Sequence, residues 1–564
     1  MASYRRQCTN TLTTPIAGQK TGTSGLRRKS TLVLETPHFV DNWVQSLVNA
    51  LGTDTVKNST FILGGDGRFF NDVAARIIIK ILAGNGAAKV IVGQHGLMST
   101  PAVSNFIRRM NGGDKREVLG GLILTASHNP AGPSGDWGIK FNAGNGEPAL
   151  ESLTNLIYEE SQRISELHQI EFPDGFLDFS NVGVREDAGF ILEVVDSCTA
   201  YIDMLKSIFD FPDLSRFCAD HRVLFDGMHA VTGAYAHAIF CKELGLDESC
   251  LFNCTPKPDF GGGHPDPNLI YAAGLVESMR NSPDFALGAA SDGDGDRNMI
   301  VGGGGFFVSP SDSLAIIASF ATRAIHYFKV HGLKGVARSM PTSQAVDLVA
   351  SSENVKCYQT PTGWKFFGNL MDAGRANLCG EESFGTGADH IREKDGIWAV
   401  LCWLSILAYV NRDKASFVSV KDICEQHWDK FGRHFYRRCD YEECELVHAE
   451  HVFEELRRNV AHWPETESGW ELSKAEEYTY TDPVDGSVAR KQGIVFSFEN
   501  GSRVIFRLSG TGSAGATIRV YLERYCREWR TESEELEKGK LMEFALKWSK
   551  LEQITARKAP NVVT

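Results

Sequence analysis

The sequence lacks an apolar run long enough to cross a bilayer. Its most apolar stretch, Ile397 to Val410, covers 14 residues, whereas a membrane-spanning helix needs about 20. Arg5 and Arg6 near the start are not followed by the apolar segment of a secretion signal. We therefore expect no integral membrane association, and we expect residues 397–410 to form a buried helix.

The sequence also lacks an excess of positive charge and any paired cysteine spacing. A net charge of −13 argues against nucleic acid or an anionic membrane as a partner, so local basic residues must hold any anionic substrate. The 13 cysteines are odd in number and scattered, without the spacing of zinc-binding motifs. This usage favours reduced cysteines and a cytoplasmic protein.

What is present indicates a large α/β protein of several domains. A chain of 564 residues is too long for one core and predicts roughly three to five domains. A strand followed by a helix recurs along the first three quarters of the chain, whereas the last quarter predicts strands and one long helix. The expected strands are residues 60–63, 89–92, 121–124, 222–225, 285–290, 333–337, 355–358, 493–498, 503–508 and 517–522, and the expected helices include residues 72–83, 234–244, 343–350 and 532–551.

The segment TASHNPAG, Thr125 to Gly132, follows one of these apolar strands and ends in a turn. It presents the Ser127 hydroxyl beyond the carboxyl end of a strand, where open α/β sheets place their reactive groups. His128 is its neighbour, and Lys140 follows a short distance downstream. Although a Ser-His pair in a turn is usually structural, three further loops make a catalytic serine the better interpretation.

The second loop is DGDGDR, Asp292 to Arg297, after another small-residue strand. Carboxylates at alternate positions of an extended backbone converge on one side, and they repel one another unless a cation neutralises them. An EF-hand is excluded, because Arg297 and Gly303 stand where that loop needs glycine and glutamate. The loop therefore predicts a site for a hard divalent cation.

The third loop is CGEESFGTG, Cys379 to Gly387, with REKDG shortly after it. Its carboxylates, hydroxyl and nearby cations suit a polyhydroxylated ligand with a charged end. The fourth, Arg507 to Arg519, places hydroxyls and glycine amides between two arginines, which suits an anion because arginine grips phosphate with two hydrogen bonds. It is not a Walker loop.

Together these loops resemble the α-D-phosphohexomutase superfamily, and within it the eukaryotic-type phosphoglucomutases. Three further segments extend the likeness over almost the whole chain: GQKTGTSGLRRK (18–29), DFGGGHPDPN (259–268) and TPTGWKFFGNLMDAG (360–374). Ala131 and Gly263 are local departures from the family pattern, where glycine and histidine are common. No catalytic position is substituted.

The resemblance implies four domains around a central cleft, three related α/β domains with mixed sheets and a C-terminal α+β domain. The expected boundaries give residues 1–200 with the phosphoserine loop, 201–312 with the metal loop, 313–430 with the sugar-recognition loops and 431–564 with the phosphate-binding loop. It also implies the interconversion of glucose 1-phosphate and glucose 6-phosphate. A phosphoserine donates its phosphoryl group, and glucose 1,6-bisphosphate is the bound intermediate and activator. Hexose phosphates are the expected partners of a monomer or weak dimer.

The same resemblance implies residue roles. Ser127 is the phosphoserine, and Asp292, Asp294 and Asp296 hold Mg²⁺ together with a phosphoserine oxygen. Lys140 is expected to handle the hydroxyl proton, with a pKa lowered by nearby arginines. His128 and Arg27 are expected to position the phosphoryl group. The implied substrate contacts are Thr23, Arg27, Ser127, Asp296, Arg297, Thr362, Gly363, Glu381, Ser383, Lys394, Arg507, Ser509, Gly510, Thr511, Gly512 and Arg519.

Three alternatives stay open at this point. The chain could be a relative with a scaffold or secretion-related role, although intact Ser127 and an intact acidic triad argue against a silent protein. It could instead make glucose 1,6-bisphosphate with most of the same loops. Phosphomannomutase specificity is disfavoured, because the GEESFG loop resembles the glucose branch.

Overall fold

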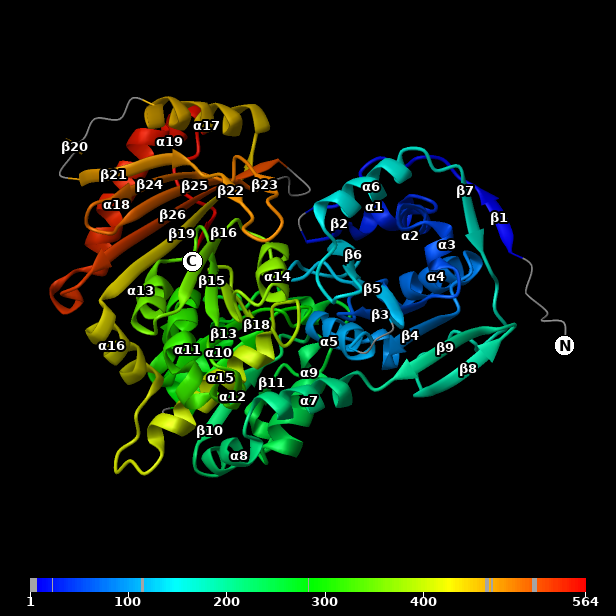
Figure 1. Ribbon diagram of the computed structural model, residues 1–564, viewed down its shortest axis with the longest axis horizontal. Coiled ribbons are helices and arrows are strands. Elements are labelled where there is room, and N and C mark those ends of the chain that lie inside the picture. The colour runs from blue at the N-terminus through cyan, green and yellow to red at the C-terminus, as the bar shows by residue number, and fades with distance from the viewer. Residues whose placement is uncertain are drawn as a thin grey trace.

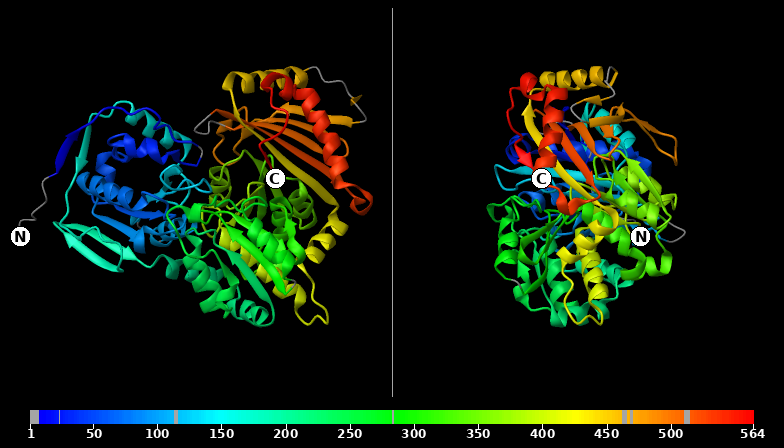
Figure 2. Two further views of the ribbon diagram at one scale, coloured as in Figure 1. Left: turned by 180° about the vertical axis from the view of Figure 1, so that it is seen from behind. Right: turned by 90° about the vertical axis from the view of Figure 1, so that its left-hand side faces the viewer.

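A computed structural model describes residues 8–22, 24–112, 116–282, 284–461, 466–467, 470–509 and 515–564. The chain forms four domains, three α/β and one α+β, so the predicted fold class is confirmed. Figure 1 shows domain I (blue to cyan) at one end of the molecule and domain IV (orange to red) above the green and yellow domain III. The side view of Figure 2 also shows domain IV (orange to red) at the top of the molecule, above the green and yellow elements.

Domain I is a seven-stranded sheet with helices on both faces. Along β3, Ile62 belongs to the core shared with α5, whereas Phe61 and Leu63 belong to the core shared with α2 and α4. A strand covered on both faces reads as a continuous apolar run. The sheet order is β2(Leu26–Lys29), β6(Asp136–Ala143), β5(Val118–Leu124), β3(Thr60–Gly65), β4(Lys89–Gly93), β9(Phe190–Val195) and β8(Gly183–Asp187), and the helices include α2(Phe39–Leu51), α4(Asn71–Gly84), α5(Thr100–Met110) and α6(Glu151–Ser161).

Domain II repeats the arrangement with five strands. Its expected helix at 234–244 divides into a short α-helix and a π-helical segment at residues 237–243. The sheet order is β11(Leu251–Phe252), β10(Arg222–Asp226), β12(Phe285–Ser291), β13(Asn298–Gly302) and β14(Phe306–Val308), and the helices include α7(Ser197–Ile208), α8(Phe211–Asp220), α9(Thr232–Ala236) and α10(Ala273–Asn281).

Domain III has four strands and the most buried helix of the described chain. All residues of α15 from Gly396 to Ala408 are buried, which confirms the buried helix expected over 397–410. The sheet order is β16(Lys356–Thr360), β15(Gly335–Ser339), β17(Leu378–Glu381) and β18(Gly385–Ala388), and the helices include α11(Pro310–Ala324), α13(Ala345–Ser352), α14(Lys365–Asp372), α15(Gly396–Asn411) and α16(Val420–Phe431).

Domain IV is an antiparallel sheet backed by helices. Strand β26 pairs with β25 on one side and with β19 on the other. The sheet order is β20(Thr466–Glu467), β21(Trp470–Glu477), β24(Ile494–Phe498), β25(Arg503–Ser509), β26(Ala516–Cys526), β19(Arg433–Cys444) and β27(Val562–Val563), and the helices are α17(Leu446–Ala461), α18(Glu534–Ser549) and α19(Leu551–Thr555).

The three α/β domains share one local topology. In each domain, three consecutive strands pair in parallel, and the first of them lies between the other two. The third strand then pairs with the antiparallel strand that follows it in the chain: β5 with β6, β12 with β13, and β17 with β18. The serine loop, the acidic loop and the GEESFG loop each connect these last two strands. The expectation that each α/β unit contributes one functional loop is therefore confirmed by the topology.

Candidate active site

Ser127 lies at the contact between the first two loops. Its hydroxyl donates to Oδ2 of Asp292 at 3.2 Å and lies 3.3 Å from Nδ1 of His128. The residue is buried, and its φ of 53° places it in the left-handed region, which costs a non-glycine residue free energy. A Cβ on Gly293 would lie 2.4 Å from the Ser127 carbonyl oxygen, so only glycine lets the acidic loop approach this closely.

A buried ion pair holds the Ser127 backbone in place. Arg68 pairs with Asp66 at 2.9 Å and donates to the Ser127 carbonyl at 2.8 Å. Asp66 in turn accepts from the Thr125 hydroxyl at 2.6 Å, and that hydroxyl accepts from the Ser127 amide at 2.8 Å. The sequence analysis did not single out Asp66 and Arg68, although they follow β3 at the same edge of the sheet.

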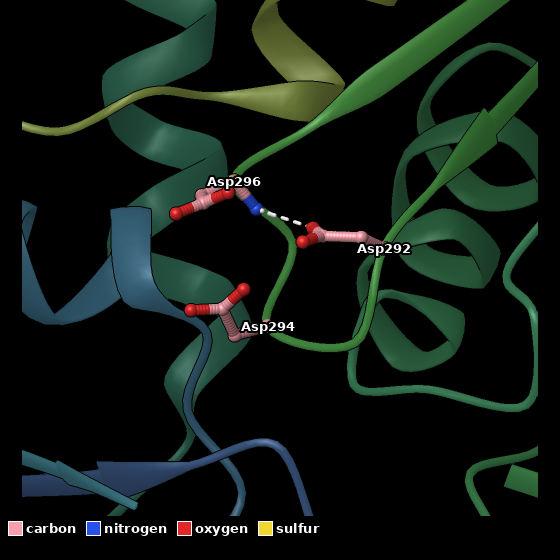
Figure 3. Close-up of side chains that lie close together, drawn as sticks. All are labelled: Asp292, Asp294 and Asp296. Atoms are coloured by element: carbon pink, nitrogen blue, oxygen red, sulfur yellow. Dashed lines mark hydrogen bonds between the residues drawn. The ribbon is translucent and has the colours of Figure 1, made fainter. Parts of the chain in front are cut away.

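The three aspartates of the second loop converge as expected. All are buried, and oxygens from each lie within 4.8 Å of one another. Figure 3 shows their side chains grouped around the loop that leaves β12. Burial, together with repulsion from Asp296 and Asp294, raises the pKa of Asp292 well above its ordinary value. Such a cluster favours a bound cation.

The free oxygens of this cluster fit a divalent metal ion. Asp292 uses Oδ1 to accept from the amides of Asp296 and Arg297, at 3.0 Å each. Within the described part of the chain, Oδ1 of Asp294 and Oδ1 of Asp296 are buried without a hydrogen-bond partner. Buried carboxylate oxygens left unsatisfied are costly, and hard cations prefer such ligands.

Two lysines border the cluster. Lys140 lies 3.2 Å from Oδ2 of Asp294 and 3.8 Å from Glu393, and Lys394 lies 3.0 Å from Asp296. Burial lowers the pKa of Lys140, but the carboxylates of Glu393 and Asp294 outweigh it and raise that pKa above its ordinary value. The expected lowering by arginines is therefore wrong for this arrangement, because the nearest charges are acidic.

His128 and Arg27 extend the positive side of the site. Burial, followed by the charges of Arg297 and Arg27, lowers the pKa of His128 well below its ordinary value. The His128 ring is therefore neutral near pH 7 and offers one donor and one acceptor. Arg27 lies on β2 opposite Gly138 and is close enough to Asp294 for the two charges to interact. The structure thus brings Arg27, His128 and Arg297 together around Ser127.

The sugar-recognition segments meet at Glu381. Its Oε1 accepts from the Gly363 amide at 2.9 Å, and burial raises its pKa. The Thr362 hydroxyl is buried with no hydrogen-bond partner among the described residues. Ser383 is half-buried in the turn between β17 and β18. An antiparallel bridge between Arg297 and Gly385 links this loop directly to the acidic loop.

In domain IV, Arg507 and Arg519 are cross-strand partners on β25 and β26. Arg507 donates to the Tyr521 hydroxyl at 3.3 Å, and Arg519 lies 3.3 Å from Asp440. Ser509 ends β25. The predicted contacts Thr23, Gly510, Thr511 and Gly512 lie outside the described residues.

Sequence reasoning missed several residues around the site. Thr100 donates to Oδ2 of Asp294 at 2.6 Å. Arg438 lies 3.3 Å from Glu382 and 2.9 Å from Asp440, which connects the third loop to Arg519. The Thr100–Asp294 and Arg438–Glu382 contacts join different domains, so no local pattern signals them.

A serine hydroxyl beside a cluster suited to a metal ion, with buried cations around it, suits transfer of a phosphoryl group. Comparisons with known proteins agree. Residues 18–168, 199–305 and 310–431 match the alpha/beta/alpha domains I, II and III of phosphoglucomutase/phosphomannomutase, and residues 433–561 match the C-terminal domain of phosphoglucomutase-1.

Relatives that match almost the whole of this chain are named phosphoglucomutases. Phosphoglucomutase 1, chloroplastic, of Marchantia polymorpha is 53% identical over 99% of this chain and 85% of its own. Cytoplasmic phosphoglucomutase of Bromus inermis is 51% identical over 98% of both chains. The open form of pp63/parafusin, a phosphoglucomutase from Paramecium, superposes with a TM-score of 0.91 at 46% identity over 99% of both chains.

Proposed function

The chain belongs to the phosphoglucomutase/phosphomannomutase family, and on this premise we propose that its phosphoglucomutase reaction proceeds through phosphorylated Ser127. The reaction interconverts glucose 1-phosphate and glucose 6-phosphate. The single observation that carries the proposal is the buried Ser127 hydroxyl, 3.2 Å from Asp292 and next to Gly293. The phosphoryl group passes from Ser127 to O6 of glucose 1-phosphate, and the phosphate at C1 of the bisphosphate then returns to Ser127.

Mg²⁺ is the proposed metal ion, held by Asp292, Asp294 and Asp296 together with an oxygen on Ser127. When bound, it would offset the negative charge of the transferring phosphoryl group. The unpartnered Oδ1 atoms of Asp294 and Asp296 support this assignment.

Protein side chains supply the remaining charges. Lys140, which lies beside Asp294 and Glu393, is suited to pass the proton between the two oxygens. It gives a proton to the Ser127 oxygen as the phosphoryl group leaves and takes up the proton of the attacking O6 hydroxyl. In the return transfer it takes up the Ser127 hydroxyl proton and gives a proton to O1 of the sugar. Neutral His128 and the guanidiniums of Arg27 and Arg297 orient the phosphoryl group and neutralise its charge.

The assay that tests the whole proposal measures turnover of glucose 1-phosphate with and without catalytic glucose 1,6-bisphosphate, and mass spectrometry locates the phosphate. We expect activation by the bisphosphate and a phosphate on Ser127. Accumulation of free bisphosphate as the main product would indicate a synthase instead.

A cytoplasmic location is also proposed. The scattered cysteines of the sequence and the relatives named cytoplasmic support it.

Sugar recognition is proposed to rest on Glu381 and Ser383, with Thr362, Gly363 and Lys394 beside the sugar or its phosphate. Turning the ring roughly exchanges the positions of its equatorial hydroxyls, so the same groups serve both orientations. Glu381 is well suited to this, because it is buried and its Oε1 is held in place by the Gly363 amide.

Glu381→Ala should therefore impair turnover of both sugar phosphates. Loss of a buried hydrogen-bonding group costs roughly 1–3 kcal/mol, which corresponds to about ten- to a hundredfold in kcat/KM. Because the equilibrium constant fixes the ratio of the two kcat/KM values, the individual KM values are diagnostic, and both should rise. Glu381→Gln, which still accepts from Gly363, controls for loop geometry. A KM that stays at the wild-type value for one sugar phosphate would contradict the shared role.

The distal phosphate is proposed to bind between Arg507 and Arg519, together with Ser509 and with Gly510, Thr511 and Gly512. The pairing of the two arginines across β25 and β26 supports a common anion site. Thr23 is proposed to contact phosphate from the amino-terminal segment.

Arg519→Ala should raise KM and also lower kcat, because binding energy remote from the reacting atoms is used to organise the site. More bisphosphate should escape to solvent while it reorients in the site, since one of the two arginines that bind its distal phosphate is lost. Steady-state kinetics with a coupled assay for free bisphosphate measures both effects, and Arg519→Lys controls for charge alone. Unchanged KM together with unchanged release would mean that Arg519 serves only its ion pair with Asp440.

A further inference from the structure

Thr100 is buried at the contact between domain I and the acidic loop of domain II. It is the first residue of α5, directly after the capping residue Ser99. Its hydroxyl donates to Oδ2 of Asp294 at 2.6 Å, and its amide donates to the Asp294 carbonyl at 2.9 Å. One residue of domain I therefore holds both the side chain and the backbone of Asp294.

The side-chain hydrogen bond decides which Asp294 oxygen is available. Oδ2 is occupied by Thr100 and by Lys140. Oδ1 has no hydrogen-bond partner in the described part of the chain, so it is the oxygen left available to ligate a cation. Loss of the Thr100 hydroxyl would leave Lys140, among the described residues, as the only group that donates to Oδ2, and the carboxylate would be freer to rotate.

The acidic loop is fitted closely to the start of α5. Gly295 has a φ of +81°, and a Cβ there would lie 2.9 Å from Cγ2 of Thr232 and 3.2 Å from Cβ of Ser99. The Ser99 amide also donates to the Tyr235 hydroxyl at 3.2 Å. Domain I carries Ser127 as well, so the Thr100 bond fixes the acidic loop relative to the nucleophile.

We propose that Thr100 is a positioning residue for the divalent cation: it orients Asp294 as a metal ligand and fixes the position of the acidic loop relative to Ser127. This inference rests on the proposed metal role of Asp294. Partners that orient metal ligands typically contribute about 10- to 100-fold to metal affinity.

The test is direct titration of the full-length protein with Mn²⁺, followed by electron paramagnetic resonance, with equal phosphorylation of all variants verified by intact mass. Thr100→Val should weaken Mn²⁺ binding by about 10- to 100-fold, whereas Thr100→Ser should restore most of the affinity. The Mg²⁺ concentration for half-maximal turnover should rise in parallel, and excess Mg²⁺ should recover kcat, which a loss of folded protein would not allow.

The chain offers a matched control in Thr232. Its side chain packs near the same loop and is buried, but its hydroxyl has no hydrogen-bond partner among the described residues. Thr232→Val should therefore bind Mn²⁺ as the wild type does. Thr100→Ala, which deletes the hydroxyl without adding a methyl group, is the second variant in case Thr100→Val unfolds.

Unchanged Mn²⁺ affinity in folded Thr100→Val and Thr100→Ala, or an equal loss in Thr232→Val, would overturn the inference. The wild-type titration reports separately on the proposed function. If the wild type binds no Mn²⁺, the metal site itself is wrong and the role of Thr100 falls with it.

Discussion

Ser127→Ala is expected to reduce mutase turnover by roughly 10⁴-fold or more, because loss of a covalent nucleophile removes the reaction path rather than weakening it. The fold should survive. The Ser127 backbone is held by Arg68 and Thr125, through its carbonyl and amide, and neither bond uses the side-chain hydroxyl.

The measurement is turnover of glucose 1-phosphate by protein purified free of host enzyme, with a thermal unfolding curve beside it. Ser134→Ala is a matched control, since Ser134 is exposed on the same loop. Incubation with glucose 1,6-bisphosphate should leave no phosphate on the Ser127→Ala protein. Activity above a few per cent of the wild type would reject Ser127 as the phosphoryl carrier.

Asp294→Asn is expected to weaken Mg²⁺ binding by more than a hundredfold, beyond the roughly 10- to 100-fold typical of an outer-shell partner. The substitution removes a charge from the cluster and leaves Thr100 and Lys140 facing a neutral amide. Phosphoryl transfer should fall in parallel, because the negative charge at the reacting oxygens would be left without its counter-ion. Asp292→Asn and Asp296→Asn should act in the same direction.

Isothermal titration with Mg²⁺ and turnover after chelation check this expectation. Asp284→Asn removes an equal charge from an exposed position just before the same strand β12, and should leave metal dependence unchanged. If chelated wild-type protein keeps its turnover, or if the three variants retain wild-type metal dependence, the aspartates do not hold a catalytic metal ion.

Local patterns in the sequence predicted most of the elements that build the site. Apolar strands expected at residues 121–124 and 285–290 placed the serine loop and the acidic loop at strand ends, and the structure gives β5 and β12 there. Strand β17, which carries Glu381, was not among the expected strands. The most apolar stretch, residues 397–410, was expected to be a buried helix because it is too short to span a bilayer, and α15 is buried. Such predictions succeed where the signal lies within one strand or one helix.

The sequence did not predict the charge balance around Lys140. Its neighbours in the chain give no acidic partner, yet Glu393 and Asp294 approach it from two other domains. The expected direction of its pKa was therefore wrong. An electrostatic environment is the sum of groups brought together by folding, so it cannot be inferred from residues on either side in the chain.

The sequence by itself determined the identity of the chemical groups: one serine, three alternating carboxylates and the glycines that let these loops approach, as at Gly293. Only the tertiary structure decided which oxygen of Asp294 is free and which residue holds the other, because Thr100 reaches it from a different domain, 194 positions away. Composition and periodicity report contacts between neighbours in the chain. The orientation of the Asp294 carboxylate depends on contacts between domains, and these contacts form only when the domains pack together.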